Sequence, residues 1–371
     1  MPSSTLDIPT YRRPEPTKEA LDYAQLARID LGKWPQEKEQ LVRELKEVVQ
    51  NDGFWFVEDY GISDEEVLRQ LAIGDAFLNL PLEEKRKHPC DFKNGNFFGF
   101  REGFRLMGNS GVKDNSEALC LPKITPSLAH EFPGFDFLQP FKPEIEAFQR
   151  KVHANVLDPL LRLFALMLEL PEDFFAAPHA WERPSEDHLR YMRYIPNTAE
   201  VDKRLEDKQY LNAHSDFGLV TLLFAQIVQG LQILLPDGTY KHVPYIPGSI
   251  VVNSADILSF ATGGYIKSTI HRVIRPPEDQ AHVPRHGLFY FSRAAHDWPT
   301  NLIAPSPLLE RLGIYHEETE EKKKWEQKIV TGLDFCRARV KHSWDRPVYG
   351  DEEFRKGFKM DGLPEVKTHY P

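Results

Sequence analysis

The sequence predicts an α+β protein with a mainly β core, in which helices fill the first half of the chain and short strands the second. Apolar residues recur with helical periodicity as far as Leu170. After Pro171 the pattern changes to short, evenly spaced apolar runs divided by turn residues. Such runs are typical of a β-sandwich or barrel and suggest a double-layered jelly roll. A chain of 371 residues, 41% of them hydrophobic, can bury a core of this size.

The N-terminal region is expected to begin with a polar arm and continue with helices. Residues 1–24 are rich in Pro, Ser, Thr and charge, which favours an arm or a disordered start. Helical spacing of apolar residues predicts a helix over 37–50, and residues 54–57 have the composition of a short strand. Ser63 and Glu66 form a capping box that opens a second helix.

Two further segments complete the N-terminal half. Residues 95–111 are rich in Gly, Asn and Phe and are expected to form a loop. Residues 143–170 return to helical periodicity, and Pro159 is expected to kink that helix. Four aromatic side chains of the loop either line a substrate pocket or pack the loop onto the core. They are Phe97, Phe98, Phe100 and Phe104.

The second half is expected to contain six strands and to end in helices. Pro236-Asp237-Gly238 lies between two of the apolar runs and is a hairpin signal. Residues 310–344 have the pattern of a charged helix pair, and the charge run over 317–324 is expected to be a solvated helix face. The apolar runs are Tyr191–Ile195, Leu219–Phe224, Leu231–Leu235, Ile250–Asn253, Thr269–Ile274 and Gly287–Phe291.

Bulk composition argues against several classes of partner. The formal charge of −10 and a pI near 5.8 disfavour nucleic acid or an anionic membrane, because both attract clustered Lys and Arg. No apolar run approaches the ~18 residues that span a bilayer, and the N-terminus lacks the apolar stretch of a signal peptide. Cys90, Cys120 and Cys336 are widely separated and are expected to be reduced, structural thiols. We therefore expect a cytoplasmic protein with a small-molecule substrate and no evident protein partner.

Three residues form a candidate metal site. His214 and Asp216 are two residues apart, so on an extended strand their side chains share one face, and His271 would come from a distant strand. Two imidazoles and one carboxylate can hold iron(II) and leave open positions for a chelating substrate and dioxygen, although the same set is compatible with catalytic zinc. No GxSxG elbow or Gly-rich phosphate loop supports a hydrolase or a nucleotide-binding protein.

The phrases around these residues are specific. They read NAHSDFGLVTLLF at 212–224, GLQI at 230–233, GSIVVNSAD at 248–256 and KSTIHRV at 267–273. In this order they resemble the iron(II)- and 2-oxoglutarate-dependent oxygenases of the isopenicillin N synthase-like family. ARIDLG at 27–32, GFWFV at 53–57 and LPLEEKR at 80–86 are similar to that family's helical N-terminal region.

The resemblance extends over nearly the whole chain and implies a domain plan. A helical N-terminal region would occupy residues 25–170, and a double-stranded β-helix would hold iron and 2-oxoglutarate in residues 171–300. C-terminal helices and a tail would fill residues 301–371. In this family a C-terminal helix often covers the barrel, which the sequence alone does not decide here.

The resemblance also assigns roles to individual residues. It gives His214, Asp216 and His271 to the metal, and it gives Arg285 to the distal carboxylate of 2-oxoglutarate. The family's Arg-x-Ser motif reads Arg285-His286-Gly287 here, so one hydroxyl donor is missing, and restoring the serine is expected to leave 2-oxoglutarate binding unchanged or modestly tighter. Tyr194 aligns with a family Tyr that helps to hold the same carboxylate; the alternative is an ordinary buried strand Tyr. Two further residues are similar to structural residues that close a strand turn, namely Asn253 and Asp256.

The implied activity is oxidation of a small organic molecule by an enzyme that uses Fe(II), 2-oxoglutarate and dioxygen. The outcome would be hydroxylation, desaturation or ring rearrangement, in secondary metabolism, and depends on which substrate carbon the pocket presents. Gly287 keeps open an alternative, an iron-dependent oxidase of the same fold that does not use 2-oxoglutarate. A third alternative is a non-catalytic binding protein on this scaffold, because fold does not fix function.

Overall fold

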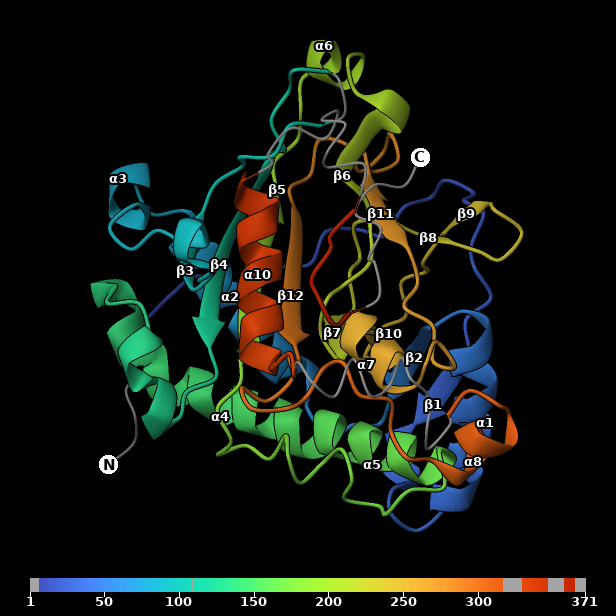
Figure 1. The fold of residues 1–371 in the computed structure, drawn as a ribbon. Coiled ribbons are helices and arrows are strands. Elements are labelled where there is room, and N and C mark those ends of the chain that lie inside the picture. The colour runs from blue at the N-terminus through green and yellow to red at the C-terminus, as the bar shows by residue number, and fades with distance from the viewer. Residues whose placement is uncertain (1–6, 108–109, 316–328, 346–356, 364–371) are drawn as a thin grey trace.

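Two β-sheets form a jelly roll, and helices cover the outer side of the larger sheet (Figure 1). The computed structural model describes residues 7–107, 110–315, 329–345 and 357–363. The eight-stranded sheet has the order β1-β2-β10-β7-β12-β5-β4-β3, and the four-stranded sheet has the order β6-β11-β8-β9. The strands are β1 Arg28–Asp30, β2 Phe54–Glu58, β3 Gly99–Arg101, β4 Ser116–Pro122, β5 His188–Tyr194, β6 Gln209–His214, β7 Val220–Phe224, β8 Leu231–Leu234, β9 Tyr240–His242, β10 Ile250–Ser254, β11 His271–Ile274 and β12 Arg285–Phe291.

The longer helices belong mainly to the N-terminal half, as the sequence predicts, and α10 lies near the C-terminal end. Short 3-10 turns connect many of the elements. The α-helices are α1 Lys38–Asn51, α2 Asp64–Leu78, α3 Leu82–Lys85, α4 Lys142–Val152, α5 Asp158–Met167, α6 Ala199–Asp202, α7 Asp256–Ala261, α8 Pro307–Arg311 and α10 Gly332–Asp345. None of the helices in the described part of the chain has both the length and the apolar character needed to cross a lipid bilayer.

The alternation of side chains along β12 divides the apolar core into two layers. Leu288 and Tyr290 point to the side of the large sheet that packs against α1, α2, α4 and α5. Phe289 points to the other side, where a smaller apolar cluster lies between the two sheets. The space between the sheets is therefore lined by every second residue of the strands, and the cavity described below opens there.

Local signals place several elements correctly. The Ser63 hydroxyl accepts from the backbone N–H of Glu66 at 3.2 Å, and the Glu66 carboxylate accepts from the backbone N–H of Ser63 at 3.0 Å, which confirms the capping box of α2. The hairpin signal is also confirmed, since β8 and β9 pair antiparallel across the Pro236-Asp237-Gly238 turn. Gly238 takes a φ of 83° there, in the left-handed region that favours glycine.

One prediction in the N-terminal half is wrong. The segment 95–111 is not all loop, because Gly99–Arg101 forms strand β3, which pairs with β4. The sequence reasoning predicted neither of these two strands. Of the segment 143–170, residues 143–167 are helical as predicted, with α4 running through a π-helical turn at His153–Leu157 into α5, which starts at Asp158. The irregular turn directly precedes Pro159, which lacks an N–H to donate, and the predicted kink stays a prediction.

Residues 7–24 contact the body of the protein. Residues 7–24 run without helix or ladder strand, and Arg13 forms an ion pair with Asp64 while Thr17 donates to Asp279 at 2.7 Å. Of the helix pair predicted over 310–344, the structure describes α10, and the charge run over 317–324 lies outside the described residues. Figure 1 shows α10 in front of the large sheet, on the side where the cavity opens.

Candidate metal centre

The two histidines face each other across a strand pair. His214 is the last residue of β6, His271 is the first residue of β11, and the antiparallel register sets them opposite one another. Their ring centroids are 4.3 Å apart. His271 therefore comes from a strand that is distant in sequence but adjacent in space. The third direction comes from Asp216, which lies beyond the end of β6 and not on an extended strand with His214.

The three side chains enclose a space the size of one ion. The Nε2 atom of His214 is 3.8 Å from Oδ1 of Asp216, and the Nε2 atom of His271 is 4.0 Å from Oδ2. One ligand atom from each residue lies within 4.8 Å of the other two. Each ring has its Nδ1 atom beside a backbone carbonyl, at 2.8 Å for His214 and 3.3 Å for His271. When Nδ1 carries the proton and donates it there, Nε2 is free to bind a metal.

Neighbouring groups hold the Asp216 carboxylate in place. Its Oδ2 atom accepts from the Thr221 hydroxyl at 2.6 Å and from the Asn253 side-chain amide at 3.0 Å. Asn253 therefore lies on β10 and contacts a ligand, instead of closing a strand turn as the family resemblance suggested. The backbone N–H of Asp256 donates to the Asp216 carbonyl at 2.9 Å, so the loop after β6 is fixed as well.

The charge states suit a divalent cation. Burial, together with the charge of His271, lowers the pKa of His214 to about 3, so its imidazole is neutral at neutral pH. Burial alone would raise the pKa of Asp216, but His271, His214 and the two hydrogen bonds hold it well below its usual range. The site therefore presents a carboxylate and a neutral imidazole of the kind that metals bind. This donor set fits iron(II).

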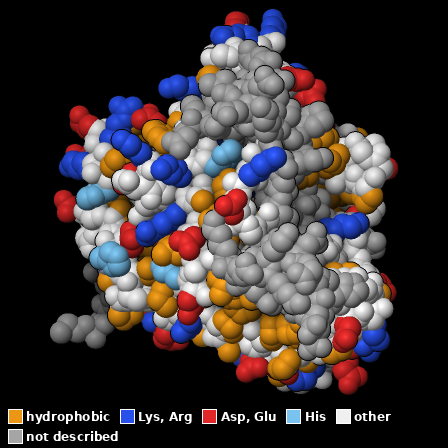
Figure 2. Space-filling view, in the orientation of Figure 1, with side chains coloured by type: hydrophobic (Ala, Val, Ile, Leu, Met, Phe, Trp, Pro, Cys, Tyr) orange, Lys and Arg blue, Asp and Glu red, His pale blue; other side chains and the backbone are white. Residues whose placement is uncertain are grey.

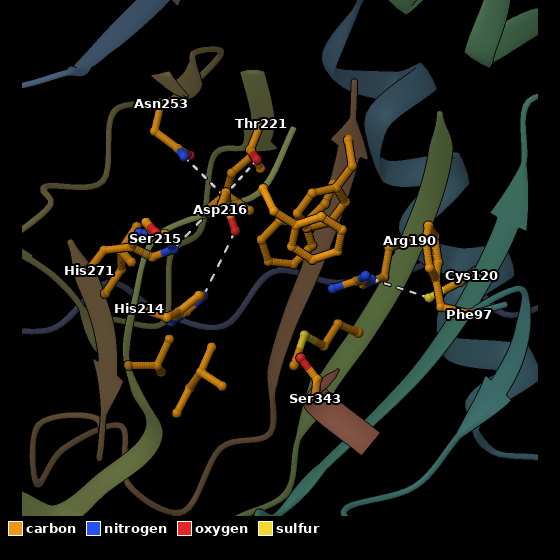
Figure 3. A pocket seen from close by; sticks show the side chains of 18 of the residues that line it. Phe97, Cys120, Arg190, His214, Ser215, Asp216, Thr221, Asn253, His271 and Ser343 are labelled. Atoms are coloured by element: carbon orange, nitrogen blue, oxygen red, sulfur yellow. Dashed lines mark hydrogen bonds and ion pairs between the residues drawn. The ribbon is translucent and has the colours of Figure 1, made fainter. Parts of the chain in front are cut away.

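A cavity with about 1180 Å³ of empty space, part of it open to solvent, adjoins these ligands between the two sheets (Figure 3). Two of the four loop aromatics, Phe97 and Phe104, line it. The other two do not: Phe98 lies within the cluster between the sheets and Phe100 packs against Phe77. Helix α10 contributes to the cavity wall through Val340 and Ser343, so this helix does cover part of the barrel.

Arg285 and Tyr194 are cross-strand neighbours on β12 and β5, and both line the cavity. Arg285 is only 2% exposed, its Nε donates to the Val228 carbonyl at 3.1 Å, and its guanidinium lies 5.5 Å from the Tyr194 ring. Burial lowers the pKa of Arg285 to about 10, so it stays charged at neutral pH. Among the residues that the structure describes, no carboxylate side chain contacts Arg285. A buried cation without a counter-ion is unfavourable, which fits an anionic ligand at this position.

The missing serine has a steric reason. A Cβ atom on Gly287 would lie 2.5 Å from Nε2 of Gln226 and 2.5 Å from the Phe289 ring. A serine at position 287 would therefore require these two side chains to move. The effect of such a serine on 2-oxoglutarate binding stays a prediction.

Sequence reasoning missed a set of cationic residues in the cavity wall. A signal for one of them was present, because Arg190, Met192 and Tyr194 alternate along β5 and so share one face. Placing Tyr194 in the cavity therefore also places Arg190 there. The missed arginines are Arg101, Arg105, Arg190 and Arg293.

Comparisons with known proteins agree with this geometry. The model of the 2OG-Fe(II) oxygenase superfamily matches residues 186–293, and the model of the non-haem dioxygenase in morphine synthesis N-terminal region matches residues 26–130. The UPF0676 protein C1494.01 of Schizosaccharomyces pombe is 34% identical over 245 residues, which cover 63% of this chain and 72% of that protein. The chain belongs to the 2OG-Fe(II) oxygenase superfamily. Its predicted family, fold class and cofactors are thereby confirmed.

Other relatives are consistent with this family. A 2-oxoglutarate-Fe(II) type oxidoreductase of Aspergillus fumigatus is 28% identical and covers 64% of this chain and 73% of its own. A full-length Neurospora crassa protein, crystallised in complex with alpha-KG, has a TM-score of 0.71 at 23% identity, covering 89% of this chain and 99% of that one. As a superfamily member this protein is a 2-oxoglutarate-dependent dioxygenase that uses Fe(II), 2-oxoglutarate and dioxygen. The oxidase and binding-protein alternatives are not favoured.

Proposed function

We propose that this dioxygenase oxidises a small organic molecule, with iron(II) held by His214, Asp216 and His271 and with the distal carboxylate of 2-oxoglutarate held by Arg285 and Tyr194. One observation carries the proposal: the three metal-binding side chains and a buried guanidinium without a counter-ion line the same cavity. A dicarboxylate that chelates a metal at one end and meets Arg285 at the other fits this arrangement.

The residues of the chain have separate tasks in this scheme. Bound iron supplies the oxidising chemistry, in which decarboxylation of 2-oxoglutarate to succinate is coupled to oxidation of the substrate. Thr221 and Asn253 fix the orientation of the Asp216 carboxylate, and Arg285 would hold the distal carboxylate of the cosubstrate. The aromatic walls keep bulk water away and hold the substrate near the metal ligands.

The class of substrate follows only in part from the relatives. The proteins named azadirone synthase LFS of Melia azedarach and 2-oxoglutarate-dependent dioxygenase frbA are 28% and 27% identical to this chain. We include in the proposal a role in secondary metabolism, a cytoplasmic location, and domain boundaries near residues 24, 170 and 300. Hydroxylation, desaturation and ring rearrangement are all open to this site, because the outcome depends on which carbon the cavity presents.

An anaerobic titration followed by exposure to air tests the proposal. The purified protein should bind iron(II) and then 2-oxoglutarate, and on addition of air it should form succinate. His214→Ala, Asp216→Ala and His271→Ala should each lose iron binding while circular dichroism shows an intact fold. Normal iron content in one of these variants removes that residue from the site. Substrate oxidation without 2-oxoglutarate supports the oxidase alternative, and absence of metal binding supports the non-catalytic one.

A further inference from the structure

The cavity wall carries an excess of positive charge. Asp216 is the one carboxylate in this wall among the residues that the structure describes, whereas the arginines number five. The chain as a whole has a formal charge of −10, and on the face shown in Figure 2 Lys and Arg side chains are mixed with Asp and Glu. The excess is therefore local to the cavity, and a local field of this sign favours an anionic ligand. The five are Arg101, Arg105, Arg190, Arg285 and Arg293.

The proposed function, on which this inference rests, accounts for part of the excess. Iron(II) would be balanced by Asp216 and by the chelating carboxylate of 2-oxoglutarate, and the distal carboxylate would balance Arg285. Arg101 already has a partner, since its Nη1 lies 3.3 Å from the buried carboxylate of Asp114. Three arginines remain, namely Arg105, Arg190 and Arg293.

Arg190 reaches into the cavity from β5, across from the metal ligands (Figure 3). Its Nε donates to Sγ of Cys120 at 3.2 Å, and its Nη2 lies 3.1 Å from Nε2 of His188. Burial and the charge of Arg190 lower the pKa of His188 well below its ordinary value, so His188 is neutral and accepts this bond. The guanidinium also lies 4.3 Å from the Phe291 ring. Among the described residues no carboxylate contacts Arg190.

Arg105 makes no direct ion pair among the described residues, although the buried Asp114 carboxylate that pairs with Arg101 also acts on it electrostatically. Its side chain forms no hydrogen bond or ion pair within the described chain, and its guanidinium lies 5.3 Å from the Phe104 ring. Burial, and then the charge of Arg101, lowers the pKa of Arg105 to about 10, so it is charged at neutral pH. The Arg293 guanidinium lies 3.9 Å from the Phe217 ring, next to Asp216 in sequence, and 5.1 Å from the Phe291 ring, so it is near both the metal ligands and the ring that Arg190 contacts.

One thiol could offset part of this charge. Burial raises the pKa of Cys120, but a hydrogen bond with Cys90 and the charges of Arg190 and Arg101 lower it to about 6. An ionised Cys120 would balance Arg190 alone. Arg101 and Arg105 would still share the single charge of Asp114, so an excess of positive charge persists in either state of the thiol.

The walls beside these two arginines are apolar. Phe97, Phe104 and Phe291 line the cavity together with Met192. The ring of Phe92 lies 5.0 Å from the ring of Phe104 and also stacks at 5.7 Å on the ring of Trp344 in α10. These contacts support the position of Phe104. A ligand that fills this space buries an apolar body against aromatic rings.

We propose that the substrate is a small carboxylic acid with an apolar body, whose carboxylate is bound by Arg190 with Arg105. A guanidinium can hold a carboxylate by two charge-assisted hydrogen bonds, and the apolar body then extends between the aromatic rings toward the metal ligands. In this orientation a C–H bond of the body, and not the carboxylate, lies nearest the metal. The acid group is therefore retained in the product.

Matched pairs of acids and amides test the proposal. The probes are phenylpropanoate, cinnamate, naphthoate and octanoate, each with its primary amide, which has nearly the same shape without the charge. The full chain is loaded with Mn(II) and saturating 2-oxoglutarate, so that binding is measured by calorimetry without turnover. We expect at least one acid to bind about tenfold or more tightly than its amide. Arg190→Gln and Arg105→Gln should reduce this ratio toward one.

A neighbouring arginine supplies the control. Arg193 is on the same strand but faces away from the cavity, and it pairs with Glu117 at 2.8 Å, so Arg193→Gln should keep the acid-to-amide ratio. The proposal fails if no acid binds, if acids and amides bind equally, or if the preference survives both cavity substitutions, as it would if the acid bound the metal instead. Failure of the proposed function is separate and is visible earlier, as loss of 2-oxoglutarate binding to the unaltered, metal-loaded protein.

Discussion

Substitution of Gly287 by serine would restore the family's Arg-x-Ser motif, yet the structure predicts that it destabilises the protein. The new Cβ would lie 2.5 Å from the Gln226 amide nitrogen and 2.5 Å from the Phe289 ring. Non-bonded carbon atoms prefer about 3.5 to 4.0 Å, so each neighbour must move by about 1 Å. The Gln226 amide is not free to move without loss, because it donates to the His286 carbonyl at 2.9 Å.

The expected cost is about 1 to 3 kcal/mol, which is typical when a packed interior receives extra atoms. The free energy of unfolding should be measured by denaturant titration for the unaltered protein, Gly287→Ser and Gly287→Ala. Both substitutions should be destabilised to a similar degree, because the Cβ atom causes the overlap and the hydroxyl does not. The serine variant should not bind 2-oxoglutarate more tightly, because its side chain displaces Phe289, which lines the cavity.

A double-mutant cycle locates the cause of this destabilisation. Phe289→Ala removes the ring that the new side chain would meet, so Gly287→Ser should cost about 1 kcal/mol less in the Phe289→Ala background than in the unaltered protein. If Gly287→Ser has unaltered stability and tighter 2-oxoglutarate binding, then the cavity tolerates a hydroxyl at this position. The steric explanation of the glycine would then be wrong.

Three further predictions concern the cosubstrate, the metal and pH. In calorimetry, Arg285→Ala should weaken 2-oxoglutarate binding about 30-fold or more, and Tyr194→Phe should weaken it by at most about 10-fold. The reason is that a charge-assisted pair is stronger than a hydrogen bond from one neutral hydroxyl. A larger loss of binding in Tyr194→Phe than in Arg285→Ala would refute the assignment. Asn253→Ala should weaken iron binding about 10-fold by freeing the Asp216 carboxylate, and an unchanged dissociation constant would contradict a positioning role. Burial lowers the pKa of His179 from 6.5 to about 4, so its contribution to stability is complete above pH 6.5 and is lost as the pH falls toward 4. The unfolding free energy of His179→Gln should therefore depend less steeply on pH in this window than that of the unaltered protein, and equal slopes would rule out this residue as the cause.

The metal-binding residues could be proposed from the sequence because their spacing and flanking phrases are local. His214 and Asp216 lie within one short phrase, and the strand-like run around His271 carries its own signal. The register that sets His271 opposite His214 could not be predicted from the sequence, because the pairing of β6 with β11 joins segments more than fifty residues apart. For the same reason the contact of Asn253 with Asp216 appears only when β10 is in place.

The elements of the fold likewise divide into those that local sequence predicts and those that depend on tertiary contacts. The capping box of α2 and the hairpin turn at Gly238 were predicted because a few consecutive residues determine them. Strands β3 and β4 were missed, because Gly99–Arg101 is short and glycine-containing and becomes a strand through pairing with its neighbour. Pro159 signals an irregularity in this helix, but the sequence did not show that it takes the form of a π-helical turn at His153–Leu157.

The sequence by itself determined the family, the jelly-roll core, and the residue types available for iron and 2-oxoglutarate, because these depend on local phrases and on the period of apolar residues. Only the tertiary structure decided which side chains share the cavity. It placed Arg190 and Arg105 in one cavity wall, neither of them in a direct ion pair, and it filled the space beside Gly287 with Gln226 and Phe289. Charge balance and free volume are sums over neighbours from many strands, so they exist only once the two sheets have closed on each other.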